Sequence, residues 1–466
     1  MTSRDNQRDR AQAANTETRF TIPPGIPTKV SIEVEPGSIC RVAAASDPLN
    51  RLTVVADPDG EAAFYAEAPW KSVELQQLDV EVETASGSQH RGITLRVDLE
   101  PSRKFPSPDA DRRRRVYSSG NVRPPLSDKE MAHLSEEELL TRGYPVRPHH
   151  EDAPRAFEAW RRVVSTPAVE VDPILVPRPD TRGGLAEAGV STSWNWSGFE
   201  LRRSPFARTM RNTRPAYDWV TGTWHVPSVS SASVGDRRSV LWIGLDGDGT
   251  QDLWQAGSQQ DVVTIGGGAS PYDTPTILLS LTSYNLWTEF VPQQPATQAV
   301  TGLSIEPGDE ILVQVWIGDA GAPPSLAGKF GVALLFNLTT GVSTRIYTDR
   351  GDTRVGGSEA EWIMERPGVV PRIFVPPFSY YVLADYGTAI VYNAYAREAN
   401  AARGRGYVAY QDAANRRLNM INPSGTVLSY VDALDRYSMK FHFGSPLARR
   451  FVDGMNSISI ADLLGP

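Results

Sequence analysis

Residues 239–257 read S-V-L-W-I-G-L-D-G-D-G-T-Q-D-L-W-Q-A-G, and this stretch decides the fold. Aliphatic side chains recur at every second position of its first half, which predicts a half-buried β-strand. One face carries Leu241, Ile243 and Leu245, and the other carries Val240, Trp242, Gly244 and Asp246. The Asp-Gly-Asp-Gly run at 246–249 predicts a turn. A second strand follows, in which Gln255 points opposite to Trp254 and Ala256. The stretch therefore predicts an aromatic, a carboxylate and an amide on one wall of a sheet.

Length and composition indicate a globular protein with more than one domain. The chain has 466 residues, of which 40% are hydrophobic and 22% are charged, enough for two or three domains and at least one large core. Its formal net charge of −8 argues against a nucleic acid as partner, because phosphate binding needs a basic surface. The single cysteine, Cys40, excludes an internal disulfide framework. No run reaches the roughly 20 apolar residues of a membrane helix, so we expect no membrane partner.

The N-terminal part predicts a tail and a small domain. Residues 1–17 are polar and charged, which is typical of disorder. Residues 18–100 predict a small antiparallel β domain, because short alternating runs are separated by turn signals. These runs lie at 29–35, 51–56, 78–83 and 93–99. No recognisable reactive set accompanies them, so a scaffold is favoured over a binding module.

Residues 101–190 are rich in proline and arginine and predict a linker with two short helices. Ser135 and Glu138 form a capping box for the first helix, which ends at Gly143. Pro154 can open the second helix. Amphipathic helices this short are marginal alone, so both need a surface to dock on.

From residue 191 to 445 the sequence is rich in short strands, and residues 446–466 predict a tail. The runs lie at 218–226, 239–246, 276–290, 310–317, 329–338, 359–365, 388–394, 426–432 and 437–443. Such strands without intervening helices predict an all-β fold, a large antiparallel two-sheet sandwich of the jelly-roll, concanavalin-like kind. The interval 395–417 stays open between a loop and a helix.

Motifs in this half, taken in order, resemble the glutamic peptidases, also called eqolisins. They are N-W-S-G at 195–198, T-G-T-W-H-V-P-S at 221–228, W-I-G-L-D-G-D at 242–248 with W-Q-A-G at 254–257, W-T-E-F-V-P at 287–292, N-L-T-T-G at 337–341 and A-E-W-I-M-E at 360–365. Any one of them would be weak, but their order is specific. The resemblance implies a sandwich of two large sheets and a polypeptide substrate.

The resemblance also implies roles for single residues. Gln255 falls on the family's catalytic glutamine and Glu365 on its catalytic glutamate. Cleft positions of the family fall on Trp196, Trp242, Asp246, Trp287 and Glu289. The sequence departs from the family pattern at Thr288 and Val291, where a second aromatic residue and a tyrosine are typical, so one wall of the cleft differs.

The residue types fit peptide hydrolysis without a metal or another cofactor. On a strand, Glu361, Ile363 and Glu365 share one face, so Glu365 can project into a cleft. An ionised glutamate can take a proton from water as general base, and Gln255 can donate an N–H to the oxyanion. The six histidines show no ligand spacing, so no metal site is expected.

Other interpretations of the same residues stay open. The tryptophans can be core aromatics, Asp246 can simply fix a turn, and Glu365 can be a charge at a strand end. A carbohydrate-active or carbohydrate-binding jelly roll is one rival, with Glu289 and Glu365 as acid and nucleophile about 5 Å apart, although Gln255 has no role there. A catalytically inactive peptidase homologue is the other, and Val291 keeps it open.

We expect a monomeric endopeptidase that acts in acid and is insensitive to pepstatin. If Asp246, Glu289 and Glu365 converge, repulsion and partial burial should raise the pKa of at least one carboxyl. The absence of an apolar run in the first ten residues predicts a cytoplasmic protein, whereas the family resemblance implies a secreted one.

Residues 101–190 can also act as an inhibitory prosegment. The stretch 103–123 is strongly basic, and the proposed cleft carries carboxylates, so opposite charges would hold the stretch there until acid removes the attraction. A fixed tether between two β domains is the alternative. In that interpretation the arginine run at 112–115 is solvated. In either interpretation the Pro- and Gly-rich stretch 167–189 predicts a linker, which in a prosegment is the natural place for a cut.

Overall fold

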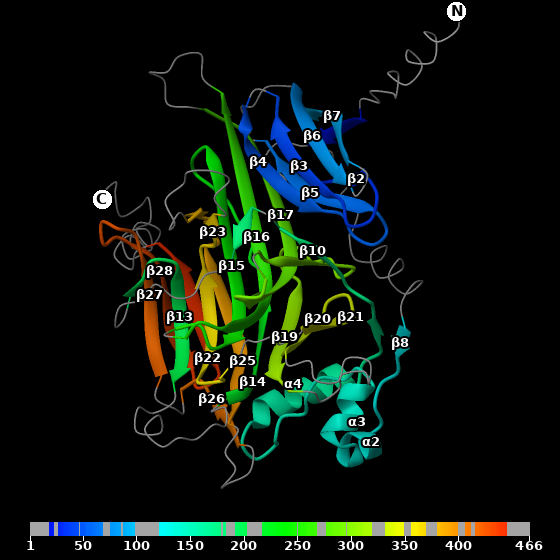
Figure 1. Cartoon of the computed structure of the whole chain (residues 1–466), viewed down its shortest axis with the longest axis vertical. Helices are drawn as coiled ribbons and strands as arrows, with labels where there is room; N and C mark the ends of the chain where they lie inside the picture. The colour runs from blue at the N-terminus through cyan, green and yellow to red at the C-terminus, as the bar shows by residue number, and fades with distance from the viewer. Residues whose placement is uncertain are drawn as a thin grey trace, which may run out of the picture. The chain divides into compact units, whose positions relative to one another are not determined.

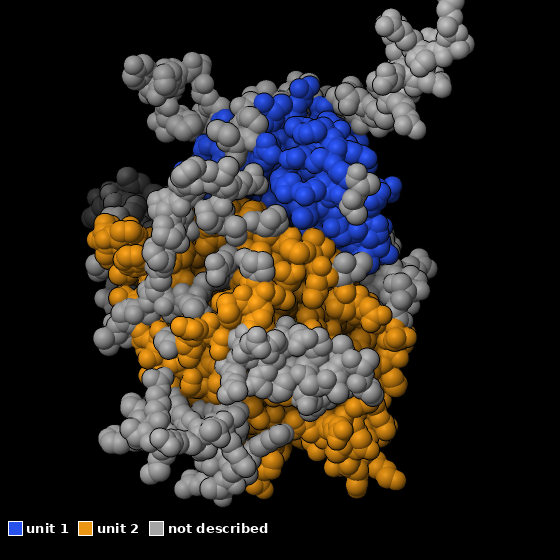
Figure 2. Space-filling model, viewed as in Figure 1, with its two compact units in different colours: residues 1–106, 230–237, 261–283 blue, residues 107–229, 238–260, 284–466 orange. Residues whose placement is uncertain are grey.

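The structure is a computed structural model (Figure 1). It describes residues 18–22, 27–45, 47–68, 75–84, 87–97, 121–178, 180–182, 192–202, 217–248, 250–267, 276–294, 296–318, 331–348, 356–369, 380–398, 406–411 and 415–444. The arginine run at 112–115 and both expected tails lie outside these residues. The chain divides into two compact units (Figure 2). Unit 1 comprises residues 1–106, 230–237 and 261–283, and unit 2 comprises residues 107–229, 238–260 and 284–466.

Unit 1 is built of strands that follow the alternating runs of the sequence. They are β1 (Thr18–Ile22), β2 (Thr28–Glu33), β3 (Ile39–Ala44), β4 (Asp47–Val55), β5 (Glu61–Glu67), β6 (Leu75–Thr84) and β7 (Gly87–Val97). The order of the first sheet is β1-β7-β6-β3-β4, and β1 joins β7 in parallel, which corrects the expectation of a purely antiparallel domain. β2 and β5 pair with each other, and β5 also pairs with β17 (Thr276–Val291).

The core of unit 1 takes side chains from two distant parts of the chain. Strands β2 to β7 bury their alternate apolar residues in it. The strands β16 (Leu253–Gly267) and β17 add Val263, Ile265, Leu279 and Leu281 to the same cluster. These two long strands therefore contribute residues to both units. This sharing could not be predicted from the sequence, because alternation along one strand does not identify its partner.

Unit 2 contains two sheets, here called the front and the back sheet. The front sheet holds β10 (Ile174–Pro177), β13 (Trp196–Arg202), β15 (Gly235–Leu245), part of β16 and β17, β18 (Gln298–Thr301) and β22 (Glu359–Glu365). The back sheet holds β8 (Asn121–Arg123), β9 (Ala168–Glu170), β14 (Tyr217–His225), β19 (Glu310–Ile317), β20 (Gly331–Asn337), β21 (Val342–Thr348), β25 (Thr388–Glu398), β26 (Gly406–Ala409), β27 (Asn415–Ile421), β28 (Val427–Asp435) and β29 (Ser438–Phe443). β27 pairs with both β28 and β13, so it joins the two sheets.

The remaining short strands connect to these sheets. β11 (Thr181–Arg182) pairs with β23 (Gly368–Val369), β12 (Thr192–Ser193) pairs with β27, and β24 (Val382–Leu383) pairs with β15.

Tryptophan side chains fill the space between the front and back sheets. Three indole N–H groups donate hydrogen bonds from one sheet to the other. They run from Trp362 to the carbonyl of Thr221 (2.9 Å), from Trp254 to the carbonyl of Val332 (3.3 Å) and from Trp224 to the hydroxyl of Ser258 (3.1 Å). Leu241, Ile243 and Leu245 are fully buried. The all-β sandwich predicted from the strand pattern is confirmed.

In the described residues before the sandwich there are three short helices (Figure 1): α2 (Asp128–His133), α3 (Glu136–Thr141) and α4 (Pro154–Val164). The capping box of Ser135 and Glu138 opens α3, and Pro154 stands at the start of α4, as predicted. A second capping box, of Ser127 and Glu130, opens α2, which the sequence analysis missed. Gly143 adopts φ +81°, a conformation that glycine favours at a helix end.

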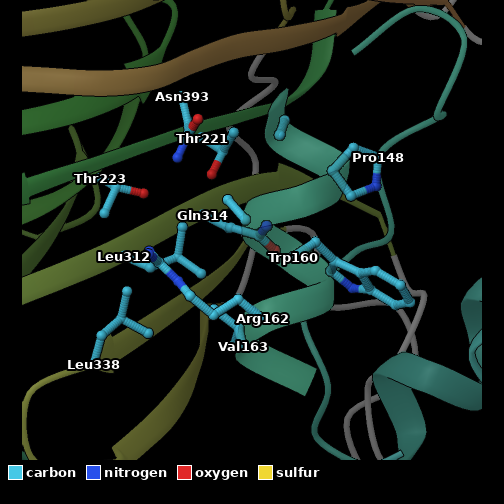
Figure 3. Close-up of a pocket in the computed structure, with 12 residues that line it drawn as sticks. Pro148, Trp160, Arg162, Val163, Thr221, Thr223, Leu312, Gln314, Leu338 and Asn393 are labelled. Carbon is cyan, nitrogen blue, oxygen red and sulfur yellow. The ribbon is translucent and has the colours of Figure 1, made fainter. Parts of the chain in front are cut away.

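The helices dock on the outer face of the back sheet. β14 shows both faces of that sheet: Gly222 lies against Ile243 and Trp362 of the front sheet, whereas Thr221 and Thr223 line a small cavity beneath α4 (Figure 3). Figure 3 also shows Trp160 and Val163 of α4 beside Leu312 and Gln314 of β19. Ion pairs add to the packing, since Arg397 binds Asp218 at 2.7 Å and Glu136 at 2.8 Å. The small cavity therefore lies between α4 and the back sheet, on the side away from the front sheet.

Two interpretations of the connecting segments need correction. The stretch 167–189 was expected to be a linker, but its described residues form β9, β10 and β11, and Arg178 is fully buried. Each of these strands is too short to show alternation, and partners elsewhere stabilise it. The interval 395–417, left open between loop and helix, contributes to β25, β26 and β27. Among the described residues, no helix is long and apolar enough to cross a membrane.

Candidate active site

The outward wall of the front sheet gathers the site residues predicted from the sequence. In the register of the sheet, Glu365 of β22 lies opposite Trp196 of β13 on one side and Val240 of β15 on the other. Trp242 lies opposite Ile363 in the same way. Residues opposite each other in paired strands share a face, so these side chains form one wall.

Glu365 is held by an indole. Its Oε2 accepts a hydrogen bond of 2.8 Å from Nε1 of Trp242, and its side chain is 0% exposed. The Trp242 ring in turn meets the Trp196 ring edge to face, with centroids 4.9 Å apart. An N–H donor of this kind favours the ionised form of a carboxylate. The arrangement therefore suits a glutamate that must accept a proton.

Gln255 is held by a second carboxyl group. Its Nε2 donates a hydrogen bond of 3.1 Å to Oε2 of Glu289, and both side chains are 0% exposed. Because a primary amide carries two N–H donors, one remains for another acceptor. The Oε1 of Gln255 has no hydrogen-bond partner in the part of the chain that the structure describes. The contact therefore fixes the amide with a donor to spare.

Apolar side chains enclose these polar groups. Trp196, Trp242 and Trp287 belong to one buried cluster, to which Val240, Leu253, Val291, Ile363 and Leu418 also belong. Val291, which departs from the family pattern, thus packs on the wall itself, whereas Thr288 is buried outside this cluster. The tryptophans are core aromatics and site-lining residues at once, so the two interpretations of them do not exclude each other.

Asp246 has a structural partner that the sequence did not reveal. Its carboxylate accepts hydrogen bonds from the backbone of Gly357 (2.8 Å) and Ser358 (2.7 Å) and from the Ser358 hydroxyl (2.8 Å). Burial raises the pKa of Asp246, and these hydrogen bonds act against the rise. Asp246 itself adopts φ +65°, which fits its place in a tight turn. The contacts tie the turn to the loop that enters β22, which favours the turn-fixing interpretation.

The structure therefore brings the predicted residues together in two groups. Gln255 meets Glu289, and Glu365 meets Trp242. Asp246 instead neighbours Glu361, whose pKa its charge helps to raise. Glu361 appeared in the sequence only as a residue on the face of Glu365, since its neighbour Glu200 is 161 positions away and only the strand register joins them. Within the described residues, no group of His, Cys, Asp or Glu is arranged to hold a metal ion.

Comparison with known proteins assigns the chain to a class. The model of the peptidase A4 family matches residues 194–442. The chain belongs to the peptidase A4 family, and its activity class is peptide-bond hydrolysis. No curated protein matches the chain.

Two solved structures are similar to it, each over 53% of this chain and 98% of its own. One is Scytalido-glutamic peptidase with a peptide-based transition state analog, at 18% identity and a TM-score of 0.38. The other is SCP-B, a member of the eqolisin family of peptidases, in a complex with the tripeptide Ala-Ile-His, at 18% identity and a TM-score of 0.36.

Proposed function

We propose that the chain is an endopeptidase that acts in acid with Glu365 as general base and Gln255 as oxyanion donor. The observation that carries the proposal is the pair of contacts on one wall. An indole N–H holds the carboxylate of Glu365, and a carboxyl group holds the amide of Gln255. Trp196, Trp242, Trp287, Asp246 and Glu289 would shape and support the cleft.

The proposed reaction needs only these two groups and water. Glu365 takes a proton from a water molecule while the water oxygen bonds to the peptide carbonyl carbon. The carbonyl oxygen becomes an oxyanion, and the spare N–H of Gln255 donates to it. Glu365 then passes the proton to the amide nitrogen, the C–N bond breaks, and an acid and an amine leave. No residue forms a covalent bond with the substrate in this scheme.

Cleavage of denatured casein across the pH range tests this function. We expect turnover to peak in acid, near or below about pH 5, because Glu365 must be ionised while at least one neighbouring buried carboxyl group carries a proton. Pepstatin and a metal chelator should leave the rate unchanged. Hydrolysis of an oligosaccharide would support the carbohydrate alternative instead. Absence of casein cleavage between about pH 2 and 8 would identify an inactive homologue.

We also propose that residues 174–182 keep the site closed in the form described. β10 pairs with β18 so that Val176 lies opposite Ala299, which is itself opposite Trp287. β11 then pairs with β23, a few residues beyond Glu365. The segment thus pairs with strands that neighbour both groups of site residues. The side chains of Gln255, Glu289 and Glu365 are fully buried.

Polar contacts fix this segment to the sheet. Buried Arg178 donates to the side chain of Asn285 at 3.0 Å, and Arg238 forms a 2.8 Å ion pair with Asp180. The described helical part of the expected prosegment has a different place, because α2 to α4 dock on the back sheet. Arg123, the last residue of the expected basic stretch, is buried against the rings of Tyr144 and Phe336. The segment that we propose to be inhibitory is therefore residues 174–182, and not the whole of residues 101–190.

Incubation of the purified chain in mild acid tests the closing role. We expect cleavage between Pro167 and Trp194, with casein cleavage appearing as the new N-terminus accumulates in the mass spectrum. The Glu365→Gln variant, held in the same buffer, should stay whole, since the cut would be made by the enzyme itself. A chain that digests casein while remaining full length would contradict the proposal.

A further inference from the structure

A row of charged side chains crosses the front sheet beside the candidate active site. Glu361 of β22 lies directly opposite Glu200 of β13, and Glu200 lies opposite Arg416 of β27. Two pairs further along, on the same face, Glu359 lies opposite Arg202. Like charges directly opposite each other in paired strands repel. The sheet therefore places two carboxyl groups side by side where both cannot be ionised without cost.

The neighbouring guanidinium groups form hydrogen bonds with Glu200 rather than with Glu361. Oε2 of Glu200 accepts hydrogen bonds from Nε of Arg202 at 3.1 Å and from Arg416 at 3.2 Å. Both arginines also contact Asp248. Glu361 is 0% exposed, and in the described part of the chain neither of its oxygens has a hydrogen-bond partner.

The charges that face Glu361 all come from the strands and the turn around it. The carboxyl groups that act on it are those of Glu200, Glu359 and Asp246, and the guanidinium group is that of Arg202. Arg416 and Asp248 lie one step further away, against Glu200 and Arg202. Burial raises the pKa of Glu361 well above its usual range, and the nearby Glu200, Glu359 and Asp246 raise it further, against a smaller effect of Arg202. A buried carboxylate without a partner is costly. Glu361 therefore holds its proton to a higher pH than an ordinary glutamate does.

Glu361 also packs against the parts that support Glu365. A methyl group built on Gly247 would lie 3.3 Å from Oε2 of Glu361 and 2.8 Å from the ring of Trp196, so these three groups leave no free space. The Trp196 ring rests on the ring of Trp242, whose indole N–H holds Glu365. A charge that appears on Glu361 would push against Glu200 and Asp246 and would need water, for which this packing has no room.

We propose that Glu361 is a positioning residue that must carry a proton for Trp196 and Trp242 to hold Glu365 in its working place. The inference rests on the proposed function of Glu365. It adds a second group, Glu361, whose deprotonation sets the upper pH limit of activity. Loss of the proton separates β13 from β22 and shifts the 246–248 turn, so that Trp196 and Trp242 no longer hold Glu365. The neutral form of Glu361, present in acid, keeps these two tryptophans in place.

The Glu361→Gln variant tests the inference, because glutamine has the same shape and stays neutral. We expect the upper pH limit of casein cleavage to move up by about one pH unit or more, with the activity in acid retained. Exposed Glu158, on α4, provides the matched control: Glu158→Gln also removes one carboxyl group but should leave the pH profile unchanged.

Thermal unfolding between about pH 4 and 7 gives a readout that does not depend on activity. The folded chain holds the Glu361 proton more tightly than the unfolded chain, whose glutamates titrate near pH 4.3, so stability should fall as pH rises above about 4. The variant lacks this loss. Its Tm should match that of the wild type near pH 4 and exceed it increasingly toward neutral pH.

The Tm and activity profiles together decide whether Glu361 is a positioning residue or only a stability group. A Tm difference that does not change with pH would overturn the inference, whether or not the chain cleaves casein. A flattened Tm profile together with an unchanged activity profile would leave Glu361 a stability group only and would overturn the positioning role. If Glu361→Gln does not fold, the infrared spectrum of the wild type decides: a protonated carboxyl band must persist at neutral pH, and its absence would refute the proposal.

Discussion

Replacing Glu365 by glutamine is expected to lower kcat for casein about 10³-fold or more while the chain stays folded. The amide keeps the size of the side chain and can still meet Nε1 of Trp242 through its oxygen. It cannot take a proton from water, so the attack loses its base. The loss corresponds to about 4 kcal/mol of activation free energy. Steady-state kinetics at the pH of maximal activity measure it.

The control for Glu365 is the exposed Glu158 on α4. Glu158→Gln makes the same chemical change far from the front wall and should keep full activity. Circular dichroism and Tm should coincide for the wild type and both variants. Near-normal turnover by a folded Glu365→Gln chain would show that another group is the base.

Replacing Gln255 by alanine is expected to lower kcat about 10²- to 10³-fold, because the oxyanion loses its donor. The change also removes the hydrogen bond to Glu289, which is buried beside it. We therefore expect a moderate fall in Tm together with the loss of activity. Substrate binding, measured by KM, should change far less than kcat, since the donor acts mainly on the transition state.

Two comparisons make this prediction specific. Gln89→Ala removes an exposed amide of β7 and should leave kinetics and stability unchanged. The double variant Gln255→Ala, Glu365→Gln should be little worse than the poorer single variant, because both groups serve one transition state. Fully multiplied losses would mean that the two residues act independently and that the proposed pair is incorrect.

Much of the sandwich could be predicted because its strands show the two-residue period of a half-buried sheet. Alternation at 239–246 predicts that Trp242 and Ile243 lie on opposite faces of one strand. In the structure Trp242 belongs to the outward wall of the front sheet, and Ile243 is buried on the inner face. Motif order then placed Gln255 and Glu365, which the structure puts on that wall. Their catalytic roles stay a proposal, as does the division of the chain into domains.

What the sequence could not show depends on pairing between distant strands. Asp246 reads as a cleft residue until the loop at 356–358 is seen to bind its carboxylate. The repulsion between Glu200 and Glu361 exists only in the register of β13 and β22. The short strands β10 and β11 lie in a stretch that looks like a linker, because the edges of β18 and β23 supply their stability.

The long strands β16 and β17 have a practical consequence for anyone who wishes to produce the peptidase part alone. A protein trimmed to residues 191–466 would lose β5, the partner of β17 at Ser280 and Leu281. It would also leave Val263, Ile265 and Leu279 without the rest of their core. An apolar strand with an unpaired edge invites aggregation. A soluble minimal enzyme would therefore need this hairpin shortened, or its apolar residues replaced by charged ones, as well as the N-terminal deletion.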